Sequence, residues 1–299
     1  MDIEKMFDAV IVGAGAAGAS CAVWLARLGF APIVVDAAPQ VGGLCLLNPF
    51  VDDWNVSLPG MTGPQVADNL VHNLADAKVP VVLSYPVAHT GHDDDGFVVR
   101  ADAQVNGSVI RARHLVLATG VTARGLPHAD QVTAGVLVGP GPHIVAQEFQ
   151  GKRVAVLGGG DNAFENALYA MRRGALQVQV YARTIRAQQQ LVRQVPDGCV
   201  ARGLYEVDVL AKTINGQPFD VILVFYGWEP STPFARGLHL QRTHEGFIAT
   251  DWHTAETSHR GVYAIGEVAQ RQHPCIVTAL ADGVTAAKAI QARLEARLV

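Results

Sequence analysis

The chain has 299 residues, of which 49% are hydrophobic and 17% are charged, and its formal net charge is −4. At roughly 100 to 200 residues per domain, this length predicts about two domains. The small net charge and the lack of a basic run argue against a nucleic-acid partner. The longest weakly polar run, residues 14–26, is shorter than the roughly 18 residues of a membrane span, and the N-terminus lacks the pattern of a secretory signal. We therefore expect a cytoplasmic protein with no membrane partner.

The first glycine motif follows a short apolar strand that is expected over residues 7–12. Gly13, Gly15 and Gly18 have the spacing GxGxxG, and a helix is expected from there to residue 28. In such a unit the first glycine permits a tight turn, the second lets the backbone approach a pyrophosphate, and the third lets the helix pack on the strand. Asp36 ends the next expected strand, about 20 residues further on, where an acid bonds the ribose of an unphosphorylated adenosine. These residues predict a dinucleotide site.

A second glycine motif repeats this pattern halfway along the chain. Gly158, Gly160 and Ala163 form a GxGxxA variant, which lies between an expected strand over residues 153–157 and an expected helix over residues 164–173. The repeat predicts a second dinucleotide site.

Basic residues stand where the second motif would need its ribose-binding acid. Tyr181 occupies the position equivalent to Asp36, and Arg183 and Arg186 follow it. An acid repels a 2′-phosphate, whereas guanidinium groups pair with one, so this site favours NADPH over NADH. The alternative is that both arginines belong to a solvated helix start.

Two later strands predict how the domains are arranged. Residues 113–118 form an apolar strand that ends in Ala-Thr-Gly at Gly120, and residues 261–265 form another that ends in Gly266 and Glu267, before a long Ala-rich helix over residues 276–298. Both strands belong with the first motif, and the second motif lies between them. We expect an α/β fold of two Rossmann-like domains of the three-layer ββα type, with residues 122–246 inserted between residues 1–121 and 247–299. The crossings near Gly120 and Gly246 are candidate hinges.

These four motifs, in this order and spacing, resemble those of the low-molecular-weight thioredoxin reductases, in the class II pyridine nucleotide-disulfide oxidoreductase family. The likeness extends over nearly the whole chain. It implies FAD in the outer domain, NADPH or NADH in the inserted domain, and a homodimer.

The resemblance also implies roles for single residues. Asp36 would bind the FAD ribose, Val87 would meet the adenine through its backbone, and Glu267, where the family usually has Asp, would hold the ribitol. The backbone of Cys275 and Ile276 would face the flavin at a helix N-terminus, which stabilises negative charge on a reduced flavin. The FAD-site residues implied in this way are Gly13, Gly15, Ala16, Ala17, Gly18, Asp36, Gly42, Gly43, Cys45, Asn48, Val87, Gly120, Gly266, Glu267, Cys275 and Ile276. Those implied for the nicotinamide dinucleotide are Gly158, Gly160, Asp161, Asn162, Ala163, Tyr181, Arg183 and Arg186.

The sequence departs from that family at the redox centre. Thioredoxin reductases carry a CxxC just before the second glycine motif, whereas residues 138–143 here contain no cysteine. The four cysteines, at positions 21, 45, 199 and 275, form neither a CxxC nor a metal-ligand spacing. The nearest branch without the pair is the thioredoxin-reductase-like ferredoxin and flavodoxin NADP reductases. Residues 42–49 of this chain resemble the flavin loop of those enzymes in length. This implies that reduced flavin passes electrons straight to an external acceptor, which is a small molecule or a small redox protein.

Four residues are catalytic candidates, and three functions stay open. Cys45 and Cys275 fall in segments that the family places near the flavin, where a lone cysteine can be a redox centre, although a small buried apolar side chain is the more common role. His143 and His273 are candidate proton donors. The first hypothesis is an NAD(P)H-dependent FAD oxidoreductase. The second is a disulfide or thiol reductase that uses Cys45 or Cys275, and the third is a flavoprotein without nicotinamide use that acts as a redox sensor or binding protein.

Overall fold

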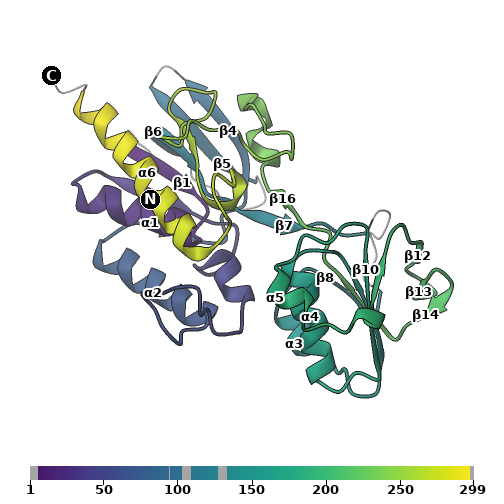
Figure 1. Ribbon diagram of the computed structural model, residues 1–299. Coiled ribbons are helices and arrows are strands. Elements are labelled where there is room, and N and C mark those ends of the chain that lie inside the picture. The colour runs from purple at the N-terminus through teal and green to yellow at the C-terminus, as the bar shows by residue number, and fades with distance from the viewer. Residues whose placement is uncertain (1–5, 94, 103–108, 127–132, 297–299) are drawn as a thin grey trace. The chain divides into compact units, whose positions relative to one another are not determined.

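Two sheets with parallel central strands, each with a glycine loop after one of its inner strands, form the framework of the chain (Figure 1). The computed structural model describes residues 6–93, 95–102, 109–126 and 133–296. Their contacts divide them into unit 1, which is the part before Thr122 and after Trp228, and unit 2, which is Thr122–Trp228. Unit 2 is therefore inserted in the sequence of unit 1.

The sheet of unit 1 is built on strands that are buried on both faces. Its parallel strands, in spatial order, are β3 (Val81–Val82), β2 (Pro32–Val35), β1 (Met6–Val12), β6 (Ile110–Leu117) and β17 (Val262–Ala264). Every residue of β2 and the last four of β1 are buried, so these strands read as continuous apolar runs. Val10 fixes the register, because it pairs with Ile33 on one side and Leu115 on the other.

Strand β6 is long enough to pair with two different strands along one edge. Its first residues pair with the antiparallel strand β5 (Gly96–Ala101), which pairs in turn with β4 (Val87–Asp93). Its last residues pair with β17, although the two strands are far apart in sequence. The carboxyl ends of β1 and β17 therefore lie at the same edge of the sheet.

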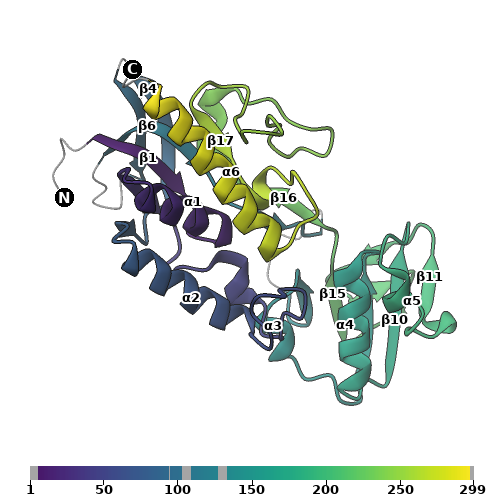
Figure 2. The same ribbon diagram turned by 60° about the vertical axis from the view of Figure 1, so that its left-hand side comes forward.

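Helices cover one face of this sheet and the β4–β5 layer covers the other. The helices are α1 (Ala16–Arg27), α2 (Gly63–Asp76) and α6 (Ile276–Glu295), as Figures 1 and 2 show. Ile11 and Val116 pack on the helical side with Leu25 of α1. Val10 packs on the opposite side with Phe97 of β5. These three layers confirm the predicted fold class for unit 1.

The longest of the described helices, α6, packs along α1 (Figure 2). Gly283 lies at their contact, where a Cβ would sit 2.5 Å from the Ala17 carbonyl oxygen and 2.7 Å from the Cys21 amide nitrogen. The Ser20 hydroxyl donates a hydrogen bond of 2.8 Å to the Leu280 carbonyl across the same contact. No helix in the described ranges combines the length and the apolar character that crossing a membrane requires.

Unit 2 repeats the three-layer plan. Its parallel strands, in spatial order, are β11 (Val200–Arg202), β10 (Gln177–Ala182), β9 (Arg153–Leu157), β15 (Val221–Val224) and β8 (Val136–Val138). Its helices are α3 (Pro142–Val145), α4 (Asp161–Arg172) and α5 (Gln189–Val192), and a meander is formed by β12 (Val207–Asp208), β13 (Thr213–Ile214) and β14 (Gln217–Pro218). Val156 of β9 packs with Phe164 of α4 on one face, and Leu157 packs with Ile214 of the meander on the other. Helix α4 begins before the predicted Phe164, because Gly160 is its N-cap.

The chain crosses between the units through two short strands that pair with each other, β7 (Val121–Ala123) and β16 (Trp228–Pro230). The return crossing corrects the expected boundary near Gly246, because residues 229–246 belong to unit 1. The reason is a 3₁₀ turn, Pro233–Leu238, which buries Ala235 and Leu238 in the core of unit 1 and accepts a hydrogen bond of 3.2 Å from the Thr90 hydroxyl at the Phe234 carbonyl. This turn is too short to give a periodic sequence pattern.

Replacing Gly283 by Ala tests the contact between α1 and α6. The new methyl group would meet backbone atoms, which move only if a helix shifts, so we expect a loss of about 1–3 kcal/mol in the free energy of unfolding. Urea denaturation followed by circular dichroism measures this loss. Lys288→Ala, at an exposed position of the same helix, is the control and should change stability by less than about 0.5 kcal/mol. Equal stability of the two variants would contradict the close contact.

Candidate functional site

The three glycines of the first loop have different surroundings. Gly13 has φ +112°, and a Cβ there would lie 2.2 Å from the Ala118 carbonyl oxygen, while a Cβ at Gly18 would lie 1.9 Å from the Gly13 carbonyl oxygen. The fold itself therefore requires glycine at both positions. Gly15 has extended backbone (φ −74°, ψ −174°), and a Cβ there would have the Gly43 Cα, 3.9 Å away, as its nearest neighbour. Since neither conformation nor packing requires glycine at this position, the space is left for something else to approach the backbone.

Helix α1 begins directly after this open position. Ala16 and Ala17 are its first residues, and the N–H groups of a first helical turn have no carbonyl partner within the helix. No acidic side chain lies in the first turn. The helix start therefore offers free donors and a partial positive charge to an anionic group.

Asp36 lies beside this loop at the end of β2. Its Oδ2 accepts a hydrogen bond of 2.6 Å from the Ala14 N–H, and its Oδ1 accepts one of 2.8 Å from the Ala38 N–H. These two bonds fix the carboxylate against the loop. Each oxygen keeps a further lone pair, so the group can still accept from a sugar hydroxyl, as the sequence predicts.

A second glycine segment meets the loop backbone to backbone. The Gly42 N–H donates to the Ala14 carbonyl (3.0 Å), and a Cβ at Gly43 would lie 3.2 Å from the Gly15 Cα. Both residues have positive φ, +133° and +54°. The 3₁₀ turn Gly43–Leu47 follows and carries Cys45 into the core.

Cys45 and Glu267 are brought together from distant parts of the sequence. Cys45 is 6% exposed, and burial, with the nearby Asp52 and Glu267 carboxylates adding to the effect, raises its pKa to about 11. Glu267 lies in the 3₁₀ turn after β17, and burial raises its pKa as well. Within the described residues, its carboxylate has no hydrogen bond or ion pair. The pair is thus a buried thiol beside a half-buried acid that has no hydrogen-bond or ion-pair partner in the part of the chain that the structure describes.

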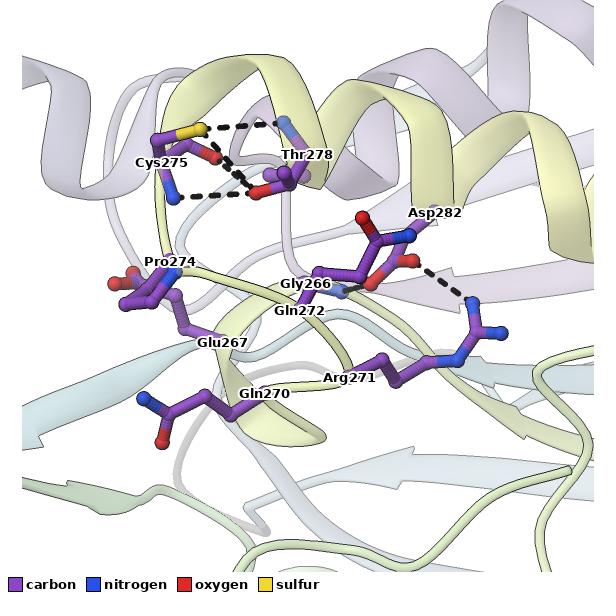
Figure 3. A pocket seen from close by; sticks show the side chains of 10 residues that line it. Gly266, Glu267, Gln270, Arg271, Gln272, Pro274, Cys275, Thr278 and Asp282 are labelled. Atoms are coloured by element: carbon purple, nitrogen blue, oxygen red, sulfur yellow. Dashed lines mark hydrogen bonds and ion pairs between the residues drawn. The ribbon is translucent and has the colours of Figure 1, made fainter. Parts of the chain in front are cut away.

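Cys275 has a structural task at the start of α6 (Figure 3). It is the N-cap, its Sγ accepts from the Thr278 N–H (3.5 Å), and its own N–H donates to the Thr278 hydroxyl (3.2 Å). Ile276 is the first helical residue. A small cavity lies beneath this turn, and residues from both ends of the 266–275 loop line it: Gly266, Glu267, Gln270, Arg271, Gln272, Pro274, Cys275, Thr278, Ala279 and Asp282.

The remaining candidate residues lie in several separate elements. His273 is exposed, and its backbone carbonyl accepts from the Thr278 hydroxyl (2.7 Å). His143 lies in unit 2, where its ring Nε2 is 3.1 Å from the Gly139 carbonyl oxygen. Asn48 accepts from the Phe50 N–H through its side chain (3.2 Å), and Val87 begins β4. Gly120 has φ +61° and no atom within 4 Å of a Cβ position.

The second glycine loop shows the same division of roles as the first. A Cβ at Gly158 would lie 2.3 Å from the Phe225 carbonyl oxygen, and one at Gly159 would lie 1.9 Å from the Thr184 carbonyl oxygen. Gly160 has extended backbone (φ −94°, ψ 179°) and no atom within 4 Å of a Cβ position. It is the N-cap of α4, so the open space again lies at a helix start. Ala163, the third motif position, is fully buried, as close helix packing requires.

Asp161 fastens the loop that follows β10. Its carboxylate accepts from the Gln188 N–H (2.7 Å) and from the Gln188 side chain (3.1 Å). The Arg186 N–H donates to the Gly159 carbonyl (2.7 Å), which closes the same loop over the glycines. The Asn162 carbonyl accepts from the Asn166 side chain (2.7 Å).

Tyr181 corrects the prediction for the second site. Its ring is 5% exposed and packs between Tyr205 and Phe219 in the core, so the side chain does not face the glycine loop. The reason is strand alternation, since Ala182 points to Gly159 and Tyr181 to the opposite face. Arg183 and Arg186 are exposed and stay available to a ligand.

Two tyrosines near Arg183 could not be found from the motifs. The Tyr205 and Tyr226 hydroxyls are 3.3 Å apart, and burial raises the pKa of both, while Arg183 partly offsets the rise. The second missed feature is an ion pair in unit 1, Arg271 with Asp282, which supports the turn that carries Glu267. An acid in the Ala-rich stretch before Gly283 was the only sequence signal for it.

Two α/β units in one chain, each with a glycine loop that is open at its second glycine, define a protein with two dinucleotide-binding domains. A family model described as pyridine nucleotide-disulphide oxidoreductase matches residues 7–202 and 192–283. The chain is 24% identical over 315 residues to a thioredoxin reductase of Coxiella burnetii, with 96% of each chain covered. It is 30% identical over 292 residues to a ferredoxin–NADP reductase of Granulibacter bethesdensis, with 88% of this chain and 81% of that one covered.

The fold is similar to that of solved relatives. The crystal structure of Lactococcus lactis thioredoxin reductase superposes with a TM-score of 0.78 at 21% identity, over 96% of this chain and 98% of that one. The chain belongs to the pyridine nucleotide-disulphide oxidoreductase family. It is therefore an oxidoreductase of the flavin- and pyridine-nucleotide-dependent kind.

The thiol of Cys45 should be unreactive at neutral pH. With a pKa of about 11, about one molecule in 1,000 carries the thiolate at pH 8, against about a quarter for an ordinary cysteine. We expect iodoacetamide to alkylate Cys45 at least about 100-fold more slowly than a small free thiol at pH 8, with the rate rising about tenfold per pH unit up to about pH 11. Peptide mass mapping measures this rate for each cysteine in one sample. Fast labelling of Cys45 at pH 8 would contradict the buried, acid-flanked site.

Proposed function

We propose that this protein is an NAD(P)H-dependent FAD oxidoreductase that passes electrons to an external acceptor without a CxxC disulfide. FAD is assigned to unit 1 and the nicotinamide dinucleotide to unit 2. The observation that carries the proposal is the open space at the second glycine of each motif. Gly15 and Gly160 are glycines that neither their backbone conformation nor their neighbours require, and both lie at a helix start with free N–H donors.

The residues of unit 1 fit FAD. The Gly15 backbone and the start of α1 are placed to hold a pyrophosphate, and Asp36 is placed to accept from a ribose hydroxyl. Glu267 supplies a half-buried acceptor, without a hydrogen-bond partner among the described residues, for a further hydroxyl of the same cofactor, which is the role that the ribitol assignment predicts. The start of α6 at Ile276 offers a partial positive charge, which favours a flavin that gains negative charge on reduction.

The residues of unit 2 fit a nicotinamide dinucleotide, and NADPH better than NADH. The Gly160 backbone and the start of α4 serve the pyrophosphate. Arg183 and Arg186 are exposed beside the loop, and no acid equivalent to Asp36 stands there to repel a 2′-phosphate. The second glycine loop keeps its motif, and the space at Gly160 is open. Both features argue against the hypothesis of a flavoprotein that has lost nicotinamide use.

The chemistry that the two cofactors supply is hydride transfer from nicotinamide to flavin. The alternative route through a single thiol has little support in the structure. Burial and two nearby acids keep Cys45 a neutral thiol. The sulfur of Cys275 accepts a hydrogen bond that caps α6. Electrons therefore leave the flavin directly, for a small molecule or a small redox protein. The relatives named thioredoxin reductase and ferredoxin–NADP reductase support an acceptor of the second kind. The homodimer that the sequence resemblance implies is part of the same proposal.

Exchanging the open glycines for alanine should separate the two sites. The backbone conformation and the space at both positions allow a methyl group. The free energy of unfolding of Gly15→Ala and of Gly160→Ala should therefore differ from that of the wild type by less than about 1 kcal/mol. We expect Gly15→Ala to bind FAD, and Gly160→Ala to bind NADPH, at least about tenfold more weakly, each leaving the other cofactor unaffected. Titration calorimetry measures both. Gly18→Ala, where the methyl meets backbone, is the control that should lose the fold. Unchanged binding by both open-glycine variants would count against the proposed sites.

Anaerobic mixing of the FAD-loaded protein with NADPH and with NADH tests the reaction itself. We expect the visible flavin absorption to bleach with NADPH, at least about tenfold faster than with NADH at equal low concentration, since Arg183 and Arg186 pair with the 2′-phosphate. Stopped-flow absorbance measures both rates, and Gly160→Ala should slow both. Lack of bleaching by either nucleotide would overturn the oxidoreductase proposal and favour a sensor or binding role.

A further inference from the structure

Strand β17 is fastened to α6 at both ends by the same kind of contact. At its carboxyl end, the Gly266 N–H donates to Asp282 Oδ2 (3.1 Å), and Arg271 pairs with Asp282 Oδ1 (2.8 Å). We call this trio the carboxyl-end clamp. At the amino end, the Gly261 N–H donates to Glu256 Oε1 (2.7 Å), and Arg293 pairs with Glu256 Oε2.

We call Gly261, Glu256 and Arg293 the amino-end clamp. Helix α6 supplies Asp282 to the first clamp and Arg293 to the second. Each clamp thus joins a glycine N–H, a carboxylate and an arginine. The two differ in position, because only the carboxyl-end clamp lies at the edge of the sheet where the glycine loop of β1 is found.

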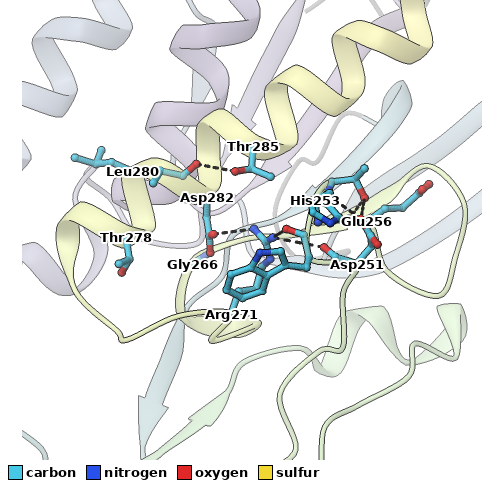
Figure 4. A network of polar contacts seen from close by, with 12 residues as sticks. Asp251, His253, Glu256, Gly266, Arg271, Thr278, Leu280, Asp282 and Thr285 are labelled. Carbon is cyan, nitrogen blue, oxygen red and sulfur yellow. Dashed lines mark hydrogen bonds and ion pairs between the residues drawn. The ribbon is translucent and has the colours of Figure 1, made fainter.

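The side chains of the ion pair in the carboxyl-end clamp, which Figure 4 draws, are buried. The Arg271 and Asp282 side chains are 4% and 5% exposed, whereas those of Arg293 and Glu256 are 33% and 16% exposed. Arg271 also donates to the Trp252 carbonyl, and its guanidinium lies 5.6 Å from the centre of the Trp252 ring. Burial raises the pKa of Asp282, and Arg271 counteracts the rise. A buried ion pair contributes little net stability to a fold, because both charges lose their hydration. Stability alone therefore does not explain why Arg271 and Asp282 are paired here.

The position of Gly266 supplies that reason. Gly266 has φ +69°, and a Cβ there would lie 2.9 Å from the Cβ of Ala17, in the first turn of α1. The clamp therefore sets how the Gly266 backbone sits against the helix start assigned to the pyrophosphate. Glu267, the next residue, is placed by the same bond. Arg271, further along the loop, ties its middle to α6, so that the loop reaches Cys275 with both ends held (Figure 3).

We propose that Arg271 and Asp282 are positioning residues for the FAD site, which hold Gly266 and Glu267 at a fixed place beside the start of α1. The inference rests on the FAD assignment of the proposed function. It predicts that breaking the carboxyl-end clamp harms the cofactor site beyond its effect on stability. The amino-end clamp, with the same chemistry at the other end of β17, should affect stability alone.

The test compares matched variants of the two clamps in the full-length, FAD-loaded protein and in the flavin-free protein that is titrated with FAD. Asp282→Asn and Arg271→Met break the carboxyl-end clamp, and Glu256→Gln and Arg293→Met break the amino-end clamp. We expect the first pair to raise the Kd for FAD at least about tenfold and the second pair less than about twofold. The first pair should also shift the visible absorption spectrum and the midpoint potential of bound flavin, which lost stability alone would not move.

Further variants keep the comparison decisive. In the double variant Arg271→Met/Asp282→Asn, no unpaired charge is left behind, so its Kd should not exceed that of the worse single variant. If Asp282→Asn does not fold, Arg271→Lys, which keeps the charge and loses the fork of donors, replaces it and should still shift the flavin spectrum.

Two results would overturn the inference, and they are distinguishable. If the wild type binds FAD and both clamps affect its Kd, spectrum and potential equally, the positioning role is wrong and the proposed function stands. If the wild type binds no FAD, the proposed function fails and the positioning role fails with it.

Discussion

The candidate sites of this protein depend on close contacts between backbone atoms, at distances that leave no room for a side chain. A Cβ at Gly18 or at Gly159 would lie 1.9 Å from a carbonyl oxygen, so the chain has no alternative to glycine there. These contacts draw the start of each helix against the end of its strand and leave the first-turn N–H groups pointing outward. The same constraint at Gly283 sets α6 against α1. Because α6 also supplies Asp282, close backbone packing and the geometry of the candidate site depend on each other.

Three carboxylates near the first site differ in their hydrogen-bond and ion-pair partners. Asp36 accepts two backbone N–H groups, Asp282 is paired with Arg271 and with one N–H, and Glu267 has no partner among the described residues. Partial removal of an acid from water is unfavourable unless a partner satisfies it, and desolvation raises the pKa of the half-buried Glu267. The unsatisfied one is also the acid to which the resemblance gives a cofactor hydroxyl. Burial, to which the Asp52 and Glu267 carboxylates add, raises the pKa of Cys45 and keeps it a neutral thiol at physiological pH.

Membership of the pyridine nucleotide-disulphide oxidoreductase family combines here with the lack of the disulfide that gives the family its name. The two facts are compatible under the proposed function, in which the glycine loops bind the cofactors through which electrons enter and a CxxC would serve only their exit. Under the proposed function, the entry side is retained and the exit changes to direct transfer from the flavin.

The sequence by itself determined the fold class and the two glycine motifs, since glycine spacing and apolar strands leave few alternatives, and it predicted which residues would contact a cofactor through backbone. It misplaced the return crossing, because the packing of residues 233–238 on unit 1 has no periodic signal. It also assigned Tyr181 to the second site, because spacing along a strand does not say which face a side chain takes. Only the tertiary structure brought Cys45 to Glu267 and Arg271 to Asp282. Such pairs depend on how separate elements pack, and packing brings together residues whose distance along the chain carries no information about their contact.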